Sequence, residues 1–268
     1  MNRKDLLSSL GFGIVAGIVA FGALSDVSVA AFFAVLAAFA MAWPLWLFRR
    51  LQVQQVVASK RADINAYHLA QIAVKLGAEA QPLPELGGIR VSPDFAGLLL
   101  EEIFTRRPRV IAEFGCGAST ILAASALRRI GAGKVFSFDH EAEFATATQS
   151  ELVRRGLTEW AEVRHAPLVP SRAEPSILTY AEAAWAGVEG IELAVVDGPP
   201  GWIKGARRGV IVDALAAKLT PGARVLFDDG MRSEIKDSLN SWTQRHPQWT
   251  AGWIDLEKGA WTLDAPKK

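Results

Sequence analysis

The chain opens with two long apolar runs that carry no charged residue. The first covers residues 6–24 and the second residues 27–48. Each is close to the roughly 20 residues that an α-helix needs to cross a bilayer. Only Ser25, Asp26 and the next residue or two remain for a turn between them. We therefore expect residues 1–50 to form a transmembrane helical hairpin.

Basic residues flank this predicted hairpin on both sides. Arg3 and Lys4 precede the first run and Arg49 and Arg50 follow the second, whereas the short turn has no basic residue. The positive-inside rule then places both ends of the hairpin, and the domain that follows, on the cytoplasmic side of the cell (inner) membrane. The alternative is a cleaved signal peptide, since a basic start, an apolar run and small residues near Ala30 also fit that pattern.

Residues 51–91 are expected to connect the hairpin to the rest of the chain. Apolar residues recur at helical spacing among Gln, Lys, Arg and Asp, which predicts an amphipathic helix with a break near Ala62. Its apolar face is expected to pack on the domain, and a juxtamembrane stalk or a lid is the alternative. A loop rich in proline and glycine follows at 81–88, and Ser92, Pro93 and Asp94 open a short helix through Ile103.

After Arg109 the pattern changes to short apolar runs that alternate with helical stretches. This is typical of parallel βαβ units. It predicts an α/β domain over residues 92–268 with a doubly wound sheet that binds its ligand beyond the carboxyl ends of the strands. The expected strands are 110–114, 134–138, 161–165, 193–196, 224–227, 252–256 and 260–263, and the expected helices are 119–129, 141–155, 208–219 and 233–245.

Composition narrows the choice of partners. The chain has 29 basic and 28 acidic residues, a formal net charge of +1, so there is no excess positive charge for a nucleic acid. Cys116 is the sole cysteine, which excludes an intrachain disulfide and a multi-cysteine metal site.

The first strand of the domain ends in a glycine turn. The segment Glu113-Phe-Gly-Cys-Gly-Ala-Ser-Thr120 runs directly into a helix, and Gly115 and Gly117 permit a tight turn and close approach of a ligand. A dinucleotide-binding fingerprint requires a third glycine where this chain has Thr120. An NAD-dependent oxidoreductase is therefore the weaker interpretation.

Carboxylates follow the next strands. Asp139 lies about twenty residues beyond the glycines, the spacing at which an acid reaches ribose hydroxyls, and the alternative is that it caps the following helix. Asp197 ends the fourth strand in Asp-Gly-Pro-Pro-Gly, and Asp228 and Asp229 end the fifth. Three carboxylates are thus expected at one rim of the sheet.

These motifs, in this order, resemble those of the class I S-adenosylmethionine (SAM) dependent methyltransferases. The resemblance covers roughly residues 93–263 and implies a Rossmann-like seven-stranded methyltransferase sheet that binds SAM. It implies that Glu113, Gly115 and Gly117 hold the methionine end, that Asp139 binds the ribose and that Ala166 borders the adenine. Ser119 stands where many members have a third glycine. The expected cofactor-binding residues are Glu113, Gly115, Gly117, Ser119, Asp139, His140, Ala166 and Asp197.

The two Asp-containing loops resemble those of methyltransferases that act on sugars or small hydroxylated substrates, and of the catechol-type O-methyltransferases. In the latter a divalent cation is held by acids at these strand ends, which implies Mg²⁺ or Mn²⁺ at Asp197, Asp228 and Asp229. This chain has Asp229 where the catechol type has asparagine. The alternative is that Asp197 acts alone as a base or positioning group while the other two order the loop.

The sequence therefore predicts a membrane-anchored, SAM-dependent methyltransferase with Asp197 and Asp228 as catalytic residues. The expected acceptor is a small-molecule or glycan-like hydroxyl compound. The competing hypotheses are a membrane-tethered NAD-dependent oxidoreductase and a non-catalytic scaffold with a degenerate methyltransferase fold.

Overall fold

A computed structural model describes residues 29–77, 82–88, 90–172 and 174–267. The chain divides into two compact units, one up to Ile64 and the other from Asn65 to Lys268. The second unit holds the α/β domain and the residues that the sequence assigns to chemistry.

One long helix, α2, runs from Val29 to Leu76. The first apolar run, residues 6–24, and its turn lie outside the described residues, so the two-helix hairpin is not supported; the described part contains a single apolar helix. The predicted break near Ala62 was wrong. No glycine or proline follows Pro44 until Gly77, so the hydrogen bonds of the helix continue uninterrupted. Gly77, at φ 84°, ends it by donating to the carbonyl of Ala73 at 3.0 Å.

The N-terminal half of α2 presents apolar side chains outward. Among the described residues, one helix meets the length and hydropathy of a membrane span, α2 between Phe33 and Leu76, with a mean hydropathy of 1.3 and none of the apolar window buried. Trp43 and Trp46 stack with ring centroids 5.3 Å apart, and the Arg50 guanidinium lies 5.3 Å from the Trp46 ring centroid. This cluster ends the most apolar part of the helix.

The α/β domain is built on a seven-stranded sheet with the order β3-β2-β1-β6-β7-β9-β8. β1, β2, β3, β6 and β7 are parallel, and β9 pairs antiparallel with both β7 and β8. The strands up to β3 are added on one side of β1, and those from β6 onward are added on its other side. This reversal of strand order between β1 and β6 marks the place where α/β sheets bind ligands. The bounds are β1 Val110–Phe114, β2 Lys134–Asp139, β3 Ala161–His165, β6 Ile191–Val196, β7 Leu219–Phe227, β8 Thr250–Ile254 and β9 Ala260–Asp264.

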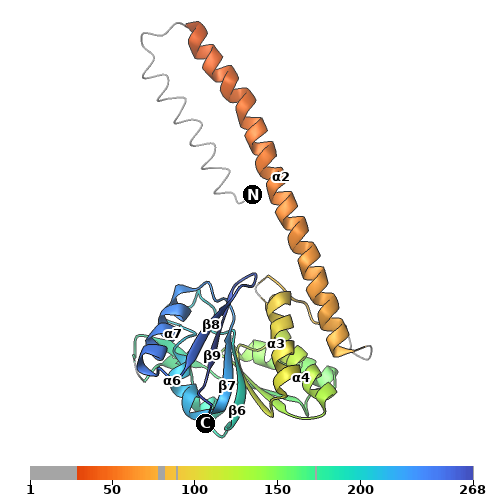
Figure 1. Cartoon of the computed structure of the whole chain (residues 1–268), viewed down its shortest axis with the longest axis vertical. Helices are drawn as coiled ribbons and strands as arrows, with labels where there is room; N and C mark the ends of the chain where they lie inside the picture. Colours follow the sequence, from red (N-terminus) through yellow and green to blue (C-terminus); the bar gives the residue numbers. More distant parts are fainter. Residues whose placement is uncertain (1–28, 78–81, 89, 173, 268) are drawn as a thin grey trace. The chain divides into compact units, whose positions relative to one another are not determined.

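Helices cover both faces of this sheet, with α3 and α4 on one side and α6 and α7 on the other (Figure 1). Alternate strand residues feed two separate cores: Ile111 and Leu193 pack under α3 and α4, whereas Ala112 and Ala194 pack under α6 and α7. The end of α2 joins the first core through Ile72, which is fully buried. The bounds are α3 Pro93–Arg106, α4 Ala118–Ile130, α5 Ala142–Arg154, α6 Ile211–Leu215 and α7 Ser233–Arg245.

The structure confirms the α/β class and each predicted strand to within a few residues, but two segments differ from expectation. The predicted helix 208–219 is only the short α6 followed by a 3-10 turn at Ala216–Lys218, because β7 already begins at Leu219. A small antiparallel hairpin of β4 (Leu168–Pro170) and β5 (Leu178–Tyr180) was missed. Strands of three residues are too short to show an alternating pattern.

Candidate functional site

The strand ends bring the predicted residues to one edge of the sheet. β1 lies between β2 and β6, and β7 lies beside β6. The glycine turn after β1 is therefore flanked by Asp139 at the end of β2 and by Asp197 after β6, with Asp228 after β7 one strand further on.

The glycine turn is held from both sides. The backbone N–H of Gly115 donates to the carbonyl of Phe138 at 2.8 Å, and that of Cys116 donates to Oδ2 of Asp139 at 2.9 Å. On the other side, a Cβ on Gly115 would lie 2.8 Å from the backbone nitrogen of Gly198, and its φ is 102°. Only glycine fits this position. A Cβ on Gly117 would meet nothing within 4 Å, so a ligand has room to approach the backbone there.

Glu113 is buried beneath this turn with 1% of its surface exposed. Its Oε2 accepts hydrogen bonds from the hydroxyls of Ser137, at 2.6 Å, and Thr120. Burial raises the pKa of Glu113, and the hydroxyls of Ser119, Ser137 and Thr120 act against that rise. In this structure Glu113 joins β1, β2 and α4 under the turn, and its contact with the cofactor stays a prediction.

Asp139 lies on the β2 side of the turn, and 6% of its surface is exposed. Its Oδ1 lies 3.2 Å from Nδ1 of His140 and accepts the backbone N–H of Glu141 at 2.9 Å. Burial alone would raise the pKa of Asp139, but the hydrogen bonds from His140, Glu141 and Cys116 lower it. The carboxylate is thus ionised and ordered. This second bond is to Glu141, the residue before α5, and α5 itself has no side-chain cap bond, so the alternative that Asp139 caps this helix is not confirmed.

The remaining predicted cofactor residues lie around these two. The backbone N–H of Ala166 donates to the carbonyl of Asp139 at 2.7 Å, and Ala166 is fully buried. Ser119 is 3% exposed in the first turn of α4. The His140 ring meets the Tyr180 ring edge-on at 6.4 Å. All three therefore belong to the same edge of the sheet.

Tyr180 is a site residue that the sequence analysis missed. It comes from β5, is 1% exposed, and its ring lies against Phe114 at 5.5 Å between centroids. A Cβ on Gly198 would lie 1.9 Å from its hydroxyl oxygen, so the hydroxyl rests on the loop after β6. Burial raises the pKa of Tyr180 well above its usual value. Nothing in a three-residue strand predicted its place.

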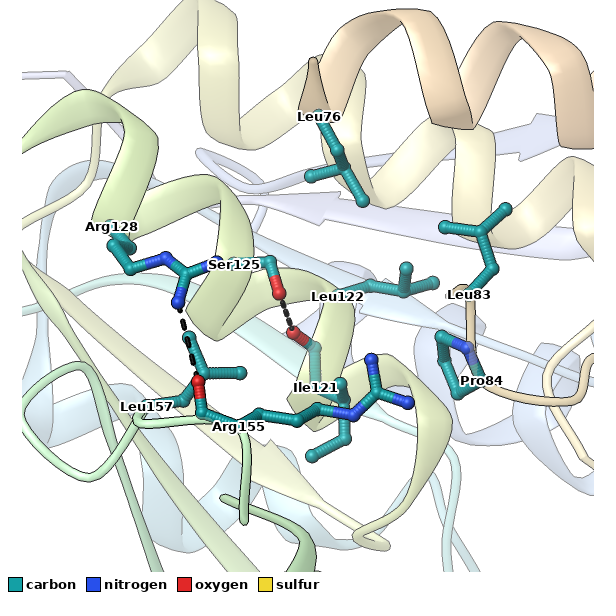
Figure 2. A pocket seen from close by; sticks show the side chains of 9 residues that line it. All are labelled: Leu76, Leu83, Pro84, Ile121, Leu122, Ser125, Arg128, Arg155 and Leu157. Carbon is teal, nitrogen blue, oxygen red and sulfur yellow. Dashed lines mark hydrogen bonds between the residues drawn. The ribbon is translucent and has the colours of Figure 1, made fainter. Parts of the chain in front are cut away.

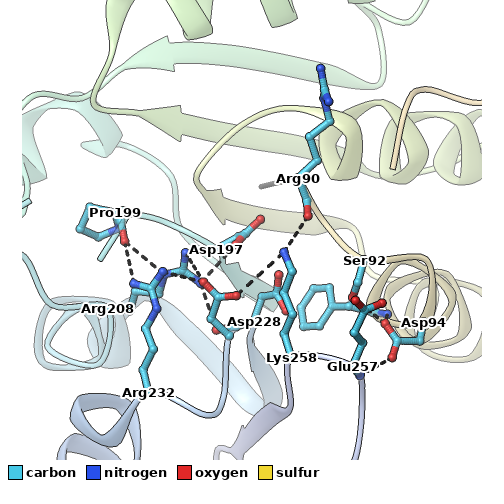
Figure 3. A network of polar contacts seen from close by, with 12 residues as sticks. Arg90, Ser92, Asp94, Asp197, Pro199, Arg208, Asp228, Arg232, Glu257 and Lys258 are labelled. Carbon is cyan, nitrogen blue, oxygen red and sulfur yellow. Dashed lines mark hydrogen bonds and ion pairs between the residues drawn. The ribbon is translucent and has the colours of Figure 1, made fainter. Parts of the chain in front are cut away.

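A buried arginine holds two of the three predicted carboxylates. Arg208 is 4% exposed, with Nη1 3.1 Å from Oδ1 of Asp197 (Figure 3) and Nη2 3.2 Å from Oδ2 of Asp229. Arg232 also pairs with Asp229 at 2.5 Å, and Lys258 lies 4.0 Å from it. Burial raises the pKa of Asp197, and Arg208 acts against that rise.

Asp228 lies beside this network without joining it through its side chain. It is 1% exposed, and within the described part of the chain neither carboxylate oxygen has a hydrogen-bond partner. Burial, and secondly the negative charge of Asp197, raise the pKa of Asp228 to about 7. A carboxyl group with this pKa exchanges protons near neutral pH.

The predicted Mg²⁺ or Mn²⁺ site at Asp197, Asp228 and Asp229 does not fit this arrangement. Such ions need several oxygen ligands at roughly 2.0 to 2.6 Å. Here the guanidinium of Arg208 already takes the facing oxygens of Asp197 and Asp229. Among the described residues, no group of three or more His, Cys, Asp or Glu side chains is placed to hold a metal ion.

A small pocket elsewhere in the domain shares no residue with this edge (Figure 2). It lies where the end of α2, the loop at Leu83 and Pro84 and α4 meet, and it is closed by Arg128, which donates to the carbonyl of Arg155 at 3.3 Å. Its lining is mostly aliphatic and lacks the carboxylates that the chemistry requires.

Comparison with known proteins agrees with this description. Residues 112–230 match a family model described as a methyltransferase domain. Similar solved structures include the methyltransferase PaMTH1 of Podospora anserina with S-adenosylhomocysteine bound, at 14% identity and a TM-score of 0.52 over 67% of this chain and 81% of that one. A methyltransferase from Geobacter sulfurreducens has 15% identity and a TM-score of 0.51 over 76% and 97% of the two chains.

The O-methyltransferase TomG of Streptomyces achromogenes, involved in tomaymycin synthesis and solved with SAM, has 18% identity and a TM-score of 0.51 over 77% of this chain and 96% of that one. No curated protein matches the chain. The fold, with its glycine turn and strand-end carboxylates, is similar to that of SAM-dependent methyltransferases, and the matched methyltransferase-domain model lies within the α/β domain.

Proposed function

We propose that this protein is a membrane-anchored, SAM-dependent methyltransferase that methylates a hydroxyl group of a small-molecule or glycan-like acceptor. The observation that carries the proposal is the direct bond between the glycine turn and Asp139, from the backbone N–H of Cys116 to Oδ2 at 2.9 Å. It brings a Gly-rich backbone and an ionised carboxylate together at the switch point of the sheet.

The residues present fit SAM. Gly117 leaves its backbone open to the methionine end, with Gly115, Ser119 and Glu113 below it. The carboxylate of Asp139 suits two vicinal ribose hydroxyls, because an ionised oxygen accepts more than one hydrogen bond. Small side chains around the adenine are supplied by Ala166 at the end of β3, beside His140. Bound SAM brings the methyl group and its own sulfide leaving group.

Asp228 is assigned as the general base. Its carboxylate accepts the proton of the acceptor hydroxyl as the oxygen forms a bond to the methyl carbon, while the bond from that carbon to sulfur breaks and S-adenosylhomocysteine leaves. Both Asp228 oxygens are free for this step, since no described group donates a hydrogen bond to them. Asp197, fixed by Arg208, is assigned to positioning, because its Oδ1 is already paired.

The anchor is assigned to the apolar part of α2, where exposed side chains from Phe33 to Phe48 leave the helix surface uniformly apolar. The aromatic and basic cluster of Trp43, Trp46, Arg49 and Arg50 suits the membrane interface. By the positive-inside rule the α/β domain faces the cytoplasm. An acceptor at or near the membrane surface is then within reach.

The test is to incubate the full chain, in detergent, with methyl-labelled SAM and an extract of membranes and metabolites, and to identify the labelled product. We expect label in a methyl ether, with Asp228→Asn reducing the rate roughly 10²- to 10⁴-fold. The exposed Asp255→Asn is the matched control and should leave the rate unchanged. Label on nitrogen, or an undiminished rate in Asp228→Asn, would contradict the assignment.

A further inference from the structure

Arg208 is a deeply buried basic residue at this edge, with 4% of its surface exposed. Besides its pairs with Asp197 and Asp229, its Nε donates to the carbonyl of Pro199 at 3.2 Å and its Nη1 donates to the carbonyl of Asp228 at 3.0 Å. One guanidinium therefore contacts the loop after β6 and the loop after β7 at the same time.

The segment that carries Arg208 is packed so that the guanidinium has little freedom. Its backbone N–H donates to Oε1 of Glu234, in the first turn of α7, at 3.3 Å. A Cβ on the next residue, Gly209, would lie 2.3 Å from Cβ of Ser238, so this segment rests directly on α7. The side chain is thus aimed into the site from a fixed backbone position.

We propose that the Arg208 guanidinium is the resident cation of this site: it ties Asp197 to Asp229 in the place where a divalent metal ion would otherwise bridge carboxylates. The catalytic role that this inference gives to Arg208 rests on the proposed function. Arg208 is a positioning residue, because it acts on the two loops and leaves Asp228 as the carboxylate that meets the acceptor.

The chemistry of the guanidinium suits this role. It is planar, always charged, and offers five donors in a rigid fork, so that one group pairs with two carboxylates and two carbonyls at once. The contacts found, two to carboxylates and two to carbonyl oxygens, use this fork. The ammonium of a lysine is a point charge with three donors and cannot make the same four contacts.

The charges around the site support the same role for Arg208. Asp197 and Asp229 are adjacent carboxylates on neighbouring loops, and without a cation between them they would repel each other in a partly buried setting. Arg232 pairs with the same oxygen of Asp229 and Lys258 lies 4.0 Å from the other, whereas Arg208 is the cation that pairs with Asp197 in the described part of the chain. Removing Arg208 therefore leaves a cation vacancy between two carboxylates, and such a vacancy favours a divalent ion with oxygen ligands.

The test is thermal unfolding of the full chain in detergent with and without about 1 mM Mn²⁺. We expect Arg208→Ala to lower Tm by roughly 5 to 15 °C, and Mn²⁺ to restore at least about a third of that loss. Wild type and the neighbouring, exposed Arg207→Ala should show neither effect. Asp197→Asn added to Arg208→Ala should abolish the Mn²⁺ response, because it removes one of the two ligands.

If Arg208→Ala does not fold, Arg208→Lys is measured in its place, with a smaller loss of Tm and no Mn²⁺ response expected, since the charge is kept. A wild-type protein whose Tm rises with Mn²⁺ through Asp197 would overturn the inference. So would a folded Arg208→Ala protein with unchanged Tm, or one that Mn²⁺ does not restore. SAM binding, measured on the same wild-type sample, tests the proposed function separately.

Discussion

Asp228 and Asp229 are adjacent in the sequence but have opposite electrostatic surroundings. Asp229 adopts a left-handed backbone conformation with φ 56°, which turns its carboxylate toward Arg208 and Arg232. Asp228 remains in line with β7, and its carboxylate is buried without a counterion or a donor among the described residues. Asp229 is therefore held by two arginines, whereas Asp228 is the residue proposed for proton transfer.

The pKa of Asp228 predicts the pH dependence of methyl transfer. Because its pKa is raised to about 7, the group is protonated and inactive as a base below that pH. We expect kcat/KM to fall about tenfold for each pH unit below about pH 7 and to level off above it. A pH-rate profile that is flat from about pH 5.5 to 8.5 would show that Asp228 is not the base.

The same raised pKa predicts an effect on stability. A carboxyl whose pKa is higher in the folded than in the unfolded protein binds its proton more tightly in the folded state. The folded protein therefore loses stability as the pH rises from 3.8, the ordinary pKa of the group, toward about 7. Asp228→Asn removes the ionised form. Its Tm should therefore exceed that of wild type by roughly 3 to 8 °C at about pH 8, by about a third of that at about pH 5, and by little below about pH 4. Equal Tm values at both pH values would count against a buried, unpaired Asp228.

At the scale of elements, the site is made by close contacts between loops. The loop after β6 passes over the glycine turn, and β5 brings the Tyr180 hydroxyl against Gly198. These contacts leave space for hydrogen only, so packing requires glycine at 115 and 198, and at 115 the φ of 102° requires it as well. The β4–β5 hairpin is thereby part of the site although it lies outside the main sheet.

This packing predicts an energetic coupling between Gly198 and Tyr180. Gly198→Ala places a methyl group 1.9 Å from the Tyr180 hydroxyl, which should cost about 1 to 3 kcal/mol of unfolding free energy. In the Tyr180→Phe background the cost should be smaller by at least about 0.5 kcal/mol, since the clashing oxygen is gone. The measurement is a double-mutant cycle by urea unfolding. Strict additivity would refute the contact.

These elements show which residues of the site could be predicted from the sequence and which could not. The glycine turn, Asp139, Asp197 and Asp228 were predictable because strands with apolar alternation place the residues that follow them at one edge. Arg208 was not, because its role depends on α6 being short and on α7 holding its backbone, neither of which a periodic pattern reveals. The metal prediction failed for the same reason: three acids were visible in the sequence, but their counterion was not.

At the scale of the whole molecule, charge and hydropathy are unevenly distributed. The net charge of +1 gives no general attraction for polyanions. The strongly apolar part of the described chain is confined to α2, where large side chains such as Phe33, Met41 and Leu45 are more than half exposed. We propose a bilayer as the partner of this exposed apolar surface, because a helix of this length can cross one.

Membrane fractionation of expressing cells tests this assignment. We expect the protein to remain in the membrane pellet after washes with about 1 M NaCl and with alkaline carbonate, because apolar burial, unlike electrostatic attachment, is insensitive to salt. A peripheral membrane protein and a cytosolic protein serve as controls for the two washes. Release of the protein by salt alone would argue for surface attachment and against a span.

Affinity for SAM tests the central claim most directly. By isothermal titration calorimetry, the full chain should bind SAM with a Kd in the micromolar range, and Asp139→Ala should weaken binding roughly 10- to 100-fold through the loss of charge-assisted hydrogen bonds to the ribose. The exposed Glu143→Ala, on the helix that follows, should bind as wild type does. A wild-type protein that does not bind SAM, or an Asp139→Ala protein with unchanged affinity, would contradict the account.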